Sequence, residues 1–142
     1  QKVVDCHDIL RTSFVWQDLD APVQVVRRRA PLAIIETDGW NASDDVEKEL
    51  WRRFDPTTYR MDLTSAPLIQ FALAHDPAGK RWLILEMSHH MIGDHSTTDE
   101  IRSEVNSILE GGGDGLSPPQ PYRALIEHVR QSIPEQEHRT FF

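Results

Sequence analysis

The apolar positions of the chain recur with two periods, one typical of helices and one typical of strands. Val3, Val4 and residues 9–10 suit one face of a short helix. Residues 12–16 combine β-branched and aromatic side chains, which favours a strand directly after that helix. The pattern therefore predicts that the chain begins with a helix that leads into a sheet.

Four more apolar runs are typical of strands. A turn at residues 18–22 ends in proline and leads into a strand at 23–27, which the proline places at a sheet edge. A short strand is predicted at 32–36. Residues 68–74 and 82–87 are two apolar runs separated by a turn sequence, which predicts a hairpin buried in the middle of a sheet.

Helical periodicity predicts two helices between and after these strands. Ser43 is a candidate N-cap for the first, and residues 55–56 end it with proline. Its apolar residues are expected to share one face: Val46, Leu50, Trp51 and Phe54. Ser96 or Thr97 can cap the second helix, which is predicted to run to about Leu109.

The last part of the chain is predicted to be a linker followed by a helix. Residues 111–120 are rich in glycine and proline, which is typical of a linker. The apolar residues of the final helix are Tyr122, Leu125, Ile126, Val129 and Ile133. Strands, hairpins and helices are interspersed, so the fold class is predicted to be α+β with two layers, and residues 1–142 form one unit.

Composition excludes some function classes and leaves others open. The net charge of -8 argues against a nucleic-acid-binding surface. No apolar run has the length of a membrane span, so no membrane partner is expected. Cys6 is the single cysteine, which fits a reducing compartment, and we expect a cytoplasmic protein. The chain begins without methionine and ends in two phenylalanines, and we expect it to be a piece of a longer protein.

Histidines gather after the second strand of the predicted hairpin. The segment from residue 88 to residue 96 contains His89, His90, Asp94 and His95. Imidazole has an ordinary pKa near neutrality, so such a segment is a candidate for proton transfer. Metal binding is the weaker alternative, because adjacent histidines generally cannot both face one ion and no familiar ligand spacing is complete, and no metal is predicted. The other alternative is a set of structural histidines that cap a helix.

Several separated segments resemble the condensation domains of nonribosomal peptide synthetases. Residues 89–94 match the first six positions of that family's HHxxxDG signature. Upstream, residues 6–14 are similar to the family's RHExLRTxF element, and residues 61–68 resemble the stretch that leads into the strand before the signature. Residues 121–125 resemble the helix after the linker. The order and spacing of the first three segments agree with the family from about residue 6 to residue 110.

The resemblance implies a fold, partners and an activity. The chain would be a partial condensation domain, most of the N-terminal lobe, with a chloramphenicol-acetyltransferase-like fold in which helices pack on a mixed, largely antiparallel sheet. The expected reaction is amide bond formation between a donor and an acceptor, each carried on the phosphopantetheine arm of a peptidyl carrier domain. No cofactor would be bound directly. Further expected partners are the C-terminal lobe of the same domain and an adjacent adenylation domain.

The resemblance also implies roles for residues. The second histidine, His90, would be catalytic, as a general base toward the amine or by stabilising the tetrahedral intermediate. His89 would be mainly structural. Asp94 would hold the segment through a salt bridge, with Arg11 or an arginine of the C-terminal lobe as its partner.

Two positions depart from the family pattern. Cys6 occupies the place of the usual arginine. His95 replaces the glycine of the signature, and it is expected to narrow the entry of the acceptor into the channel or to hydrogen-bond the substrate. Gly93 and Ser96 are expected to line the channel beside it.

Other functions share part of this pattern. The HxxxD spacing of His90 and Asp94 also fits acyltransferases that use coenzyme A or make wax esters, but the upstream element at Arg11 favours the synthetase family. Epimerization domains share the histidines and abstract a proton from an α-carbon. A catalytically silent domain that recruits a partner enzyme is the alternative from another class.

Overall fold

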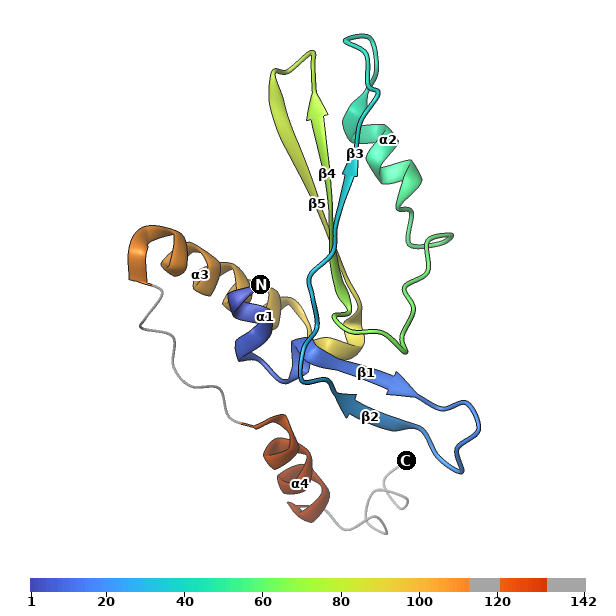
Figure 1. Ribbon diagram of the computed structural model, residues 1–142, viewed down its shortest axis with the longest axis vertical. Coiled ribbons are helices and arrows are strands. Elements are labelled where there is room, and N and C mark those ends of the chain that lie inside the picture. The colour runs from blue at the N-terminus through green and yellow to red at the C-terminus, as the bar shows by residue number, and fades with distance from the viewer. Residues whose placement is uncertain (113–120, 133–142) are drawn as a thin grey trace.

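The computed structural model describes residues 1–112 and 121–132, which form helices packed beside two small sheets (Figure 1). The first half contains α1 (Lys2–Cys6), the 3-10 turn η1 (Ile9–Arg11), β1 (Thr12–Val15), β2 (Val23–Val26), β3 (Ile34–Thr37) and α2 (Val46–Arg53). The second half contains β4 (Ile69–Asp76), β5 (Arg81–Ser88), η2 (His90–Ile92), α3 (His95–Ser107), η3 (Ile108–Gly112) and α4 (Tyr122–Ser132). None of the helices in the described ranges is long and apolar enough to cross a membrane.

The sheets are mixed, with more antiparallel than parallel pairs. β3 pairs with β4 in parallel, and β4 pairs with β5 as an antiparallel hairpin. β1 and β2 form a separate antiparallel ribbon, which crosses the base of the longer sheet (Figure 1). The prediction of an α+β fold with a mixed, largely antiparallel sheet packed by helices is therefore confirmed.

Two hydrophobic clusters hold these elements together. One lies between α2 and the sheet and contains Val46, Leu50, Phe54, Ala72 and Ala74. The other lies below the end of the hairpin and contains Val3, Val4, Leu10, Phe14, Ala30, Leu68, Ile69 and Ile92. The second cluster joins the first residues of the chain to the segment after β5, so segments far apart in the sequence support the same region.

The structure corrects the prediction for α2 at two positions. The N-cap is Asp45, whose carboxylate accepts a hydrogen bond from the N–H of Lys48 at 3.1 Å, and not Ser43. Helix α2 starts later than predicted because Asp44 closes a turn with Asn41. Trp51 is 58% exposed, so its predicted place on the apolar face is wrong. It lies about 100° round the helix from the centre of the buried stripe.

The hairpin is confirmed, but its predicted burial holds for one strand only. β4 is the central strand of its sheet, whereas β5 is an outer strand among the described residues. Trp82 and Ile84 of β5 are 64% and 68% exposed. Side chains alternate along a strand, so these two residues point away from the face that α2 covers. The strand predicted at 32–36 is β3, shifted to Ile34–Thr37.

The last helix is confirmed within the described residues. α4 spans Tyr122–Ser132, and Leu125 and Val129 on its predicted apolar face are 55% and 52% exposed. Ile133 lies outside the described residues. Most of the predicted linker at 111–120 also lies outside them.

Candidate active site

The segment from residue 88 to residue 96, called the signature segment below, leaves the end of β5 and is anchored at two points. The N–H of His89 donates to the carbonyl of Leu68 at 3.0 Å, which ties the segment to the residue before β4. Ile92 is 4% exposed and packs in the hydrophobic cluster below the hairpin. The backbone around His90 is therefore fixed by one hydrogen bond and one apolar side chain.

Gly93 follows η2 at a point where the backbone approaches helix α3 closely. A Cβ atom on Gly93 would lie 2.5 Å from the Cβ and Oγ1 atoms of Thr97. Such a contact is too short for any side chain, so the residue must be glycine if α3 is to keep its position.

Asp94 is the N-cap of helix α3. Its Oδ1 accepts hydrogen bonds from the N–H of Ser96 at 3.0 Å, the hydroxyl of Ser96 at 2.6 Å and the N–H of Thr97 at 3.3 Å. The Ser96 hydroxyl and the Thr97 N–H hold the pKa of the Asp94 carboxyl below its ordinary value. The prediction that Ser96 or Thr97 caps this helix is therefore wrong, because both donate to the preceding carboxylate.

Arg11 does not pair with Asp94. Its Nη2 forms an ion pair with Asp8 at 2.7 Å, and its Nη1 donates to the carbonyl of Arg27 at 2.6 Å. The other carboxylate oxygen of Asp8 accepts from the N–H of Tyr122 at 3.3 Å. Arg11 therefore helps to join η1, the end of β2 and the start of α4, and the bridge to Asp94 that the sequence offered as one alternative is not formed.

The adjacent histidines differ in how they are held. His89 is partly buried, and its Nδ1 accepts a hydrogen bond from the N–H of Met91 at 3.2 Å. In the neutral ring this contact leaves the proton on Nε2. His90 is exposed, and no hydrogen bond joins its ring to the described residues. The imidazole of His90 is therefore the one of the two that is open to a substrate.

Two cavities flank the signature segment, and His90 lines both. The first, called the hairpin cavity, has a volume of about 260 Å³. The residues that line this cavity and not the second include Ile69, Glu86, Ser88, His89, Asp94, His95 and Arg102. The second, called the helix cavity, has a volume of about 460 Å³. The residues that line this cavity and not the first include His7, Ile9, Leu10, Met91, Glu100, Glu104, Tyr122 and Leu125.

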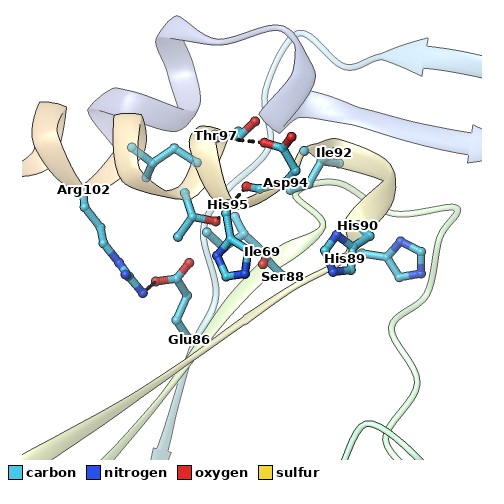
Figure 2. A pocket seen from close by; sticks show the side chains of 13 residues that line it. Ile69, Glu86, Ser88, His89, His90, Ile92, Asp94, His95, Thr97 and Arg102 are labelled. Carbon is cyan, nitrogen blue, oxygen red and sulfur yellow. Dashed lines mark hydrogen bonds and ion pairs between the residues drawn. The ribbon is translucent and has the colours of Figure 1, made fainter.

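Figure 2 shows how the hairpin cavity is built. His95 projects from the first turn of α3 toward Ser88 and Ile69 at the end of the hairpin. Beyond it, Arg102 of α3 and Glu86 of β5 form an ion pair at 3.2 Å. Ser96 lines neither cavity and its hydroxyl donates a hydrogen bond to Asp94, whereas Gly93 lines both cavities.

A side-chain hydrogen bond lies in the wall of the helix cavity. The Nε2 of His7 lies 2.7 Å from the Oε2 of Glu104, which joins the end of α1 to α3. Sequence reasoning did not single out this pair or the Glu86–Arg102 pair. The sequence did contain a pattern that points to the Glu86–Arg102 pair. Glu86 lies two residues from Ser88 on the same strand face, and Arg102 lies seven residues from His95 on the same helix face. In the described parts of the chain no group of three or more histidine, cysteine or acidic side chains is placed to hold a metal ion.

Comparison with known sequences gives one consistent result. A sequence model of the family described as "Condensation domain" matches residues 1–141. Malpinin synthetase and malpibaldin synthetase of Mortierella alpina are 48% and 46% identical to the chain over its whole length. Tyrocidine synthase 2 of Brevibacillus parabrevis is 27% identical over 91% of the chain and 4% of its own length. The chain spans 2% of the length of the two Mortierella proteins.

Solved structures are similar over nearly the whole chain. The crystal structure of holo T3CT has a TM-score of 0.68 and 27% sequence identity, and the similarity covers 95% of this chain and 31% of that chain. The starter condensation domain of rhizomide synthetase has a TM-score of 0.62 at 20% identity, covering 97% of this chain and 36% of that one. This second similarity shows the fold.

Proposed function

The chain belongs to the condensation-domain family of nonribosomal peptide synthetases, and on that basis we propose that it supplies the catalytic histidine of an amide-forming domain. The observation that carries the proposal is the place of His90. Its ring is exposed at the boundary between two cavities, so a group in either cavity can approach the same imidazole. A reaction that joins two separately delivered substrates needs such an arrangement.

The proposed chemistry is the attack of an acceptor amine on a donor thioester. The amine nitrogen forms a bond with the carbonyl carbon of the donor, and the C–S bond then breaks. His90 takes the proton that the amine loses and passes it to the departing sulfur, which leaves as a thiol. Stabilising the tetrahedral intermediate by a hydrogen bond is the other role open to the same ring.

The residues around His90 are proposed to position it. His89 and Asp94 each bind backbone N–H groups of the signature segment, and Gly93 allows α3 to approach it. Arg11 supports the elements below through Asp8. None of these side chains needs to touch a substrate for this role.

The substrates are proposed to arrive on carrier domains. Both would be thioesters of phosphopantetheine arms, one an acyl or peptidyl donor and one an aminoacyl acceptor. The remaining part of the condensation domain and an adjacent adenylation domain are the further proposed partners. A cytoplasmic location is proposed with them.

Replacement of His90 tests the proposal. In the full-length protein, with donor and acceptor carriers loaded, we expect His90→Ala to lower the rate of amide formation by about 10²–10⁴-fold, the range for loss of a general base. Product is followed by mass spectrometry and folding by circular dichroism. His128→Ala is the matched control, because His128 is exposed on α4 and lines neither cavity.

Two outcomes would contradict the proposal. Unchanged amide formation in His90→Ala would remove the histidine from the reaction. Exchange of the substrate's α-proton with solvent deuterium, with no amide product from the unaltered protein, would identify an epimerization reaction instead.

A further inference from the structure

The two cavities beside His90 differ in size and in the chemistry of their walls. The hairpin cavity is the smaller, about 260 Å³ against about 460 Å³. His95 and the Glu86–Arg102 pair bring an imidazole, a carboxylate and a guanidinium to it. The helix cavity also holds the carboxylates of Glu100 and Glu104, but six apolar side chains line it, against three in the hairpin cavity: Ile9, Leu10, Met91, Ile92, Ile101 and Leu125.

This difference matches the difference between the two proposed substrates. The acceptor is a single aminoacyl group with a free amine, whereas the donor is an acyl or peptidyl chain. The smaller cavity, with fewer apolar side chains, suits a single amino acid, and its Glu86 carboxylate can attract the acceptor's amine while it is an ammonium group. The Glu86 side chain is 20% exposed, which leaves its carboxylate reachable from the cavity beside Arg102.

His95 is placed where it limits the size of that acceptor. It lines the hairpin cavity and does not line the helix cavity, so its ring acts on one substrate only. Figure 2 shows the ring between the signature segment on one side and the Glu86–Arg102 pair on the other. A side chain on an acceptor held between His90 and Glu86 would have to share this space with the imidazole.

We propose that His95, together with the Glu86–Arg102 ion pair, determines which aminoacyl acceptor the domain uses. His95 limits the volume left for the acceptor's side chain, and Glu86 orients its amine toward His90. This inference rests on the proposed function, because it assigns one of the two substrates of that reaction to one cavity.

The test compares acceptors of different size. In the full-length protein with one fixed donor, we expect His95→Ala to raise kcat/KM for branched and aromatic aminoacyl acceptors by about tenfold, with glycyl acceptors changed less than about twofold. The KM for the donor should stay constant. His95→Gln keeps comparable bulk and should keep the original acceptor range. Asp99→Ala controls for an altered first turn of α3, because Asp99 is exposed on that helix and lines neither cavity.

A second set of acceptors tests which part of the acceptor His95 contacts. Aminoacyl thioesters of N-acetylcysteamine carry the amino acid but not the carrier domain or the full pantetheine arm. The gain in His95→Ala should persist with them. A gain that disappears would place His95 against the arm and overturn its assignment to the acceptor's side chain.

Other results would also overturn the inference. An unchanged acceptor range in His95→Ala would contradict the inference, and so would a change in the KM of the donor alone. In both cases His90→Ala would still fail to form amide, so the proposed function would stand. Amide formation by His90→Ala would instead contradict the proposed function. If His95→Ala does not fold, His95→Trp adds volume at the same place and should exclude branched acceptors while it still accepts glycine.

Glu86 is tested separately, as the residue that orients the amine. Glu86→Gln keeps the shape of the side chain and removes its charge, so the KM of every acceptor should rise several-fold and the KM of the donor should not change. Arg102→Gln, which breaks the same ion pair from α3, should leave Glu86 free to bind the amine and raise the acceptor KM less. Equal effects of the two variants on donor and acceptor would show that the pair only holds α3 against β5.

Discussion

Two regions of the molecule are held in different ways: the face of the sheet that α2 covers, and the signature segment that follows β5. Between α2 and the sheet, Leu50 and Ala72 are 3% and 0% exposed, and apolar contacts hold the helix in place. In the signature segment Ile92 is the one fully buried residue, and the conformation depends on hydrogen bonds that the side chains of His89 and Asp94 accept from the backbone.

Because the two regions are held differently, one is expected to determine mainly the stability of the protein and the other mainly its activity. A buried apolar layer contributes free energy of folding in proportion to its area, and it can lose a side chain without moving atoms at the far end of the sheet. A segment fixed by a few polar contacts contributes little to folding, but a small displacement there moves the imidazole relative to its substrates. Substitutions in the two regions should therefore have separable effects.

The largest effect on stability is expected in the layer below α2. Leu50→Ala should lower the free energy of unfolding by about 2–5 kcal/mol, because it leaves a cavity in a packed cluster. The neighbouring Trp51→Ala should change it by less than about 0.5 kcal/mol, because that side chain is exposed. Urea denaturation followed by circular dichroism measures both. Equal losses in the two variants would show that α2 is packed through its other face.

At the signature segment, a change of one methyl group should reduce activity strongly. Gly93→Ala places a Cβ against Thr97, and we expect the resulting shift of α3 to lower the rate of amide formation by about 10²-fold. Gly39→Ala is the control: its φ is +81°, but no atom lies within 4 Å of the added Cβ. It should lower stability without a loss of activity in the folded protein. Full activity in Gly93→Ala would mean that the approach of α3 to Gly93 is not needed for catalysis.

A smaller effect, visible as a pH dependence, is expected at Asp94. Its pKa is lower in the folded protein than the ordinary 3.8, so its contribution to stability is complete above that value and is lost as the pH falls through the lowered pKa. Asp94→Asn should still cap α3 and should remove this pH dependence, whereas Asp94→Ala should lose the cap at every pH. Thermal unfolding between pH 7 and pH 3 measures the difference. An unchanged acid response in Asp94→Asn would assign it to other carboxylates.

Local sequence patterns predicted the elements better than their ends or their exposure. The β-branched runs at 12–16 and 23–27 were recognised as strands because side-chain sterics act within a few residues. The start of α2 was missed because the competing turn at Asn41 and Asp44 also depends on polar side chains that favour caps. Trp51 was assigned to the core because periodicity identifies a stripe on a helix but not how wide the covering surface is.

The sequence by itself determined the fold class, the family and the segment that holds the histidines, since these depend on residue order and spacing. Only the tertiary structure decided how that segment is supported. Asp94 binds Ser96 and Thr97 at the start of α3, and Arg11 binds Asp8, so each charge has a partner two or three residues away and the bridge between them is not formed. The tertiary structure also brought Glu86 and Arg102 together beside His95, a meeting of a strand and a helix that no local pattern specifies.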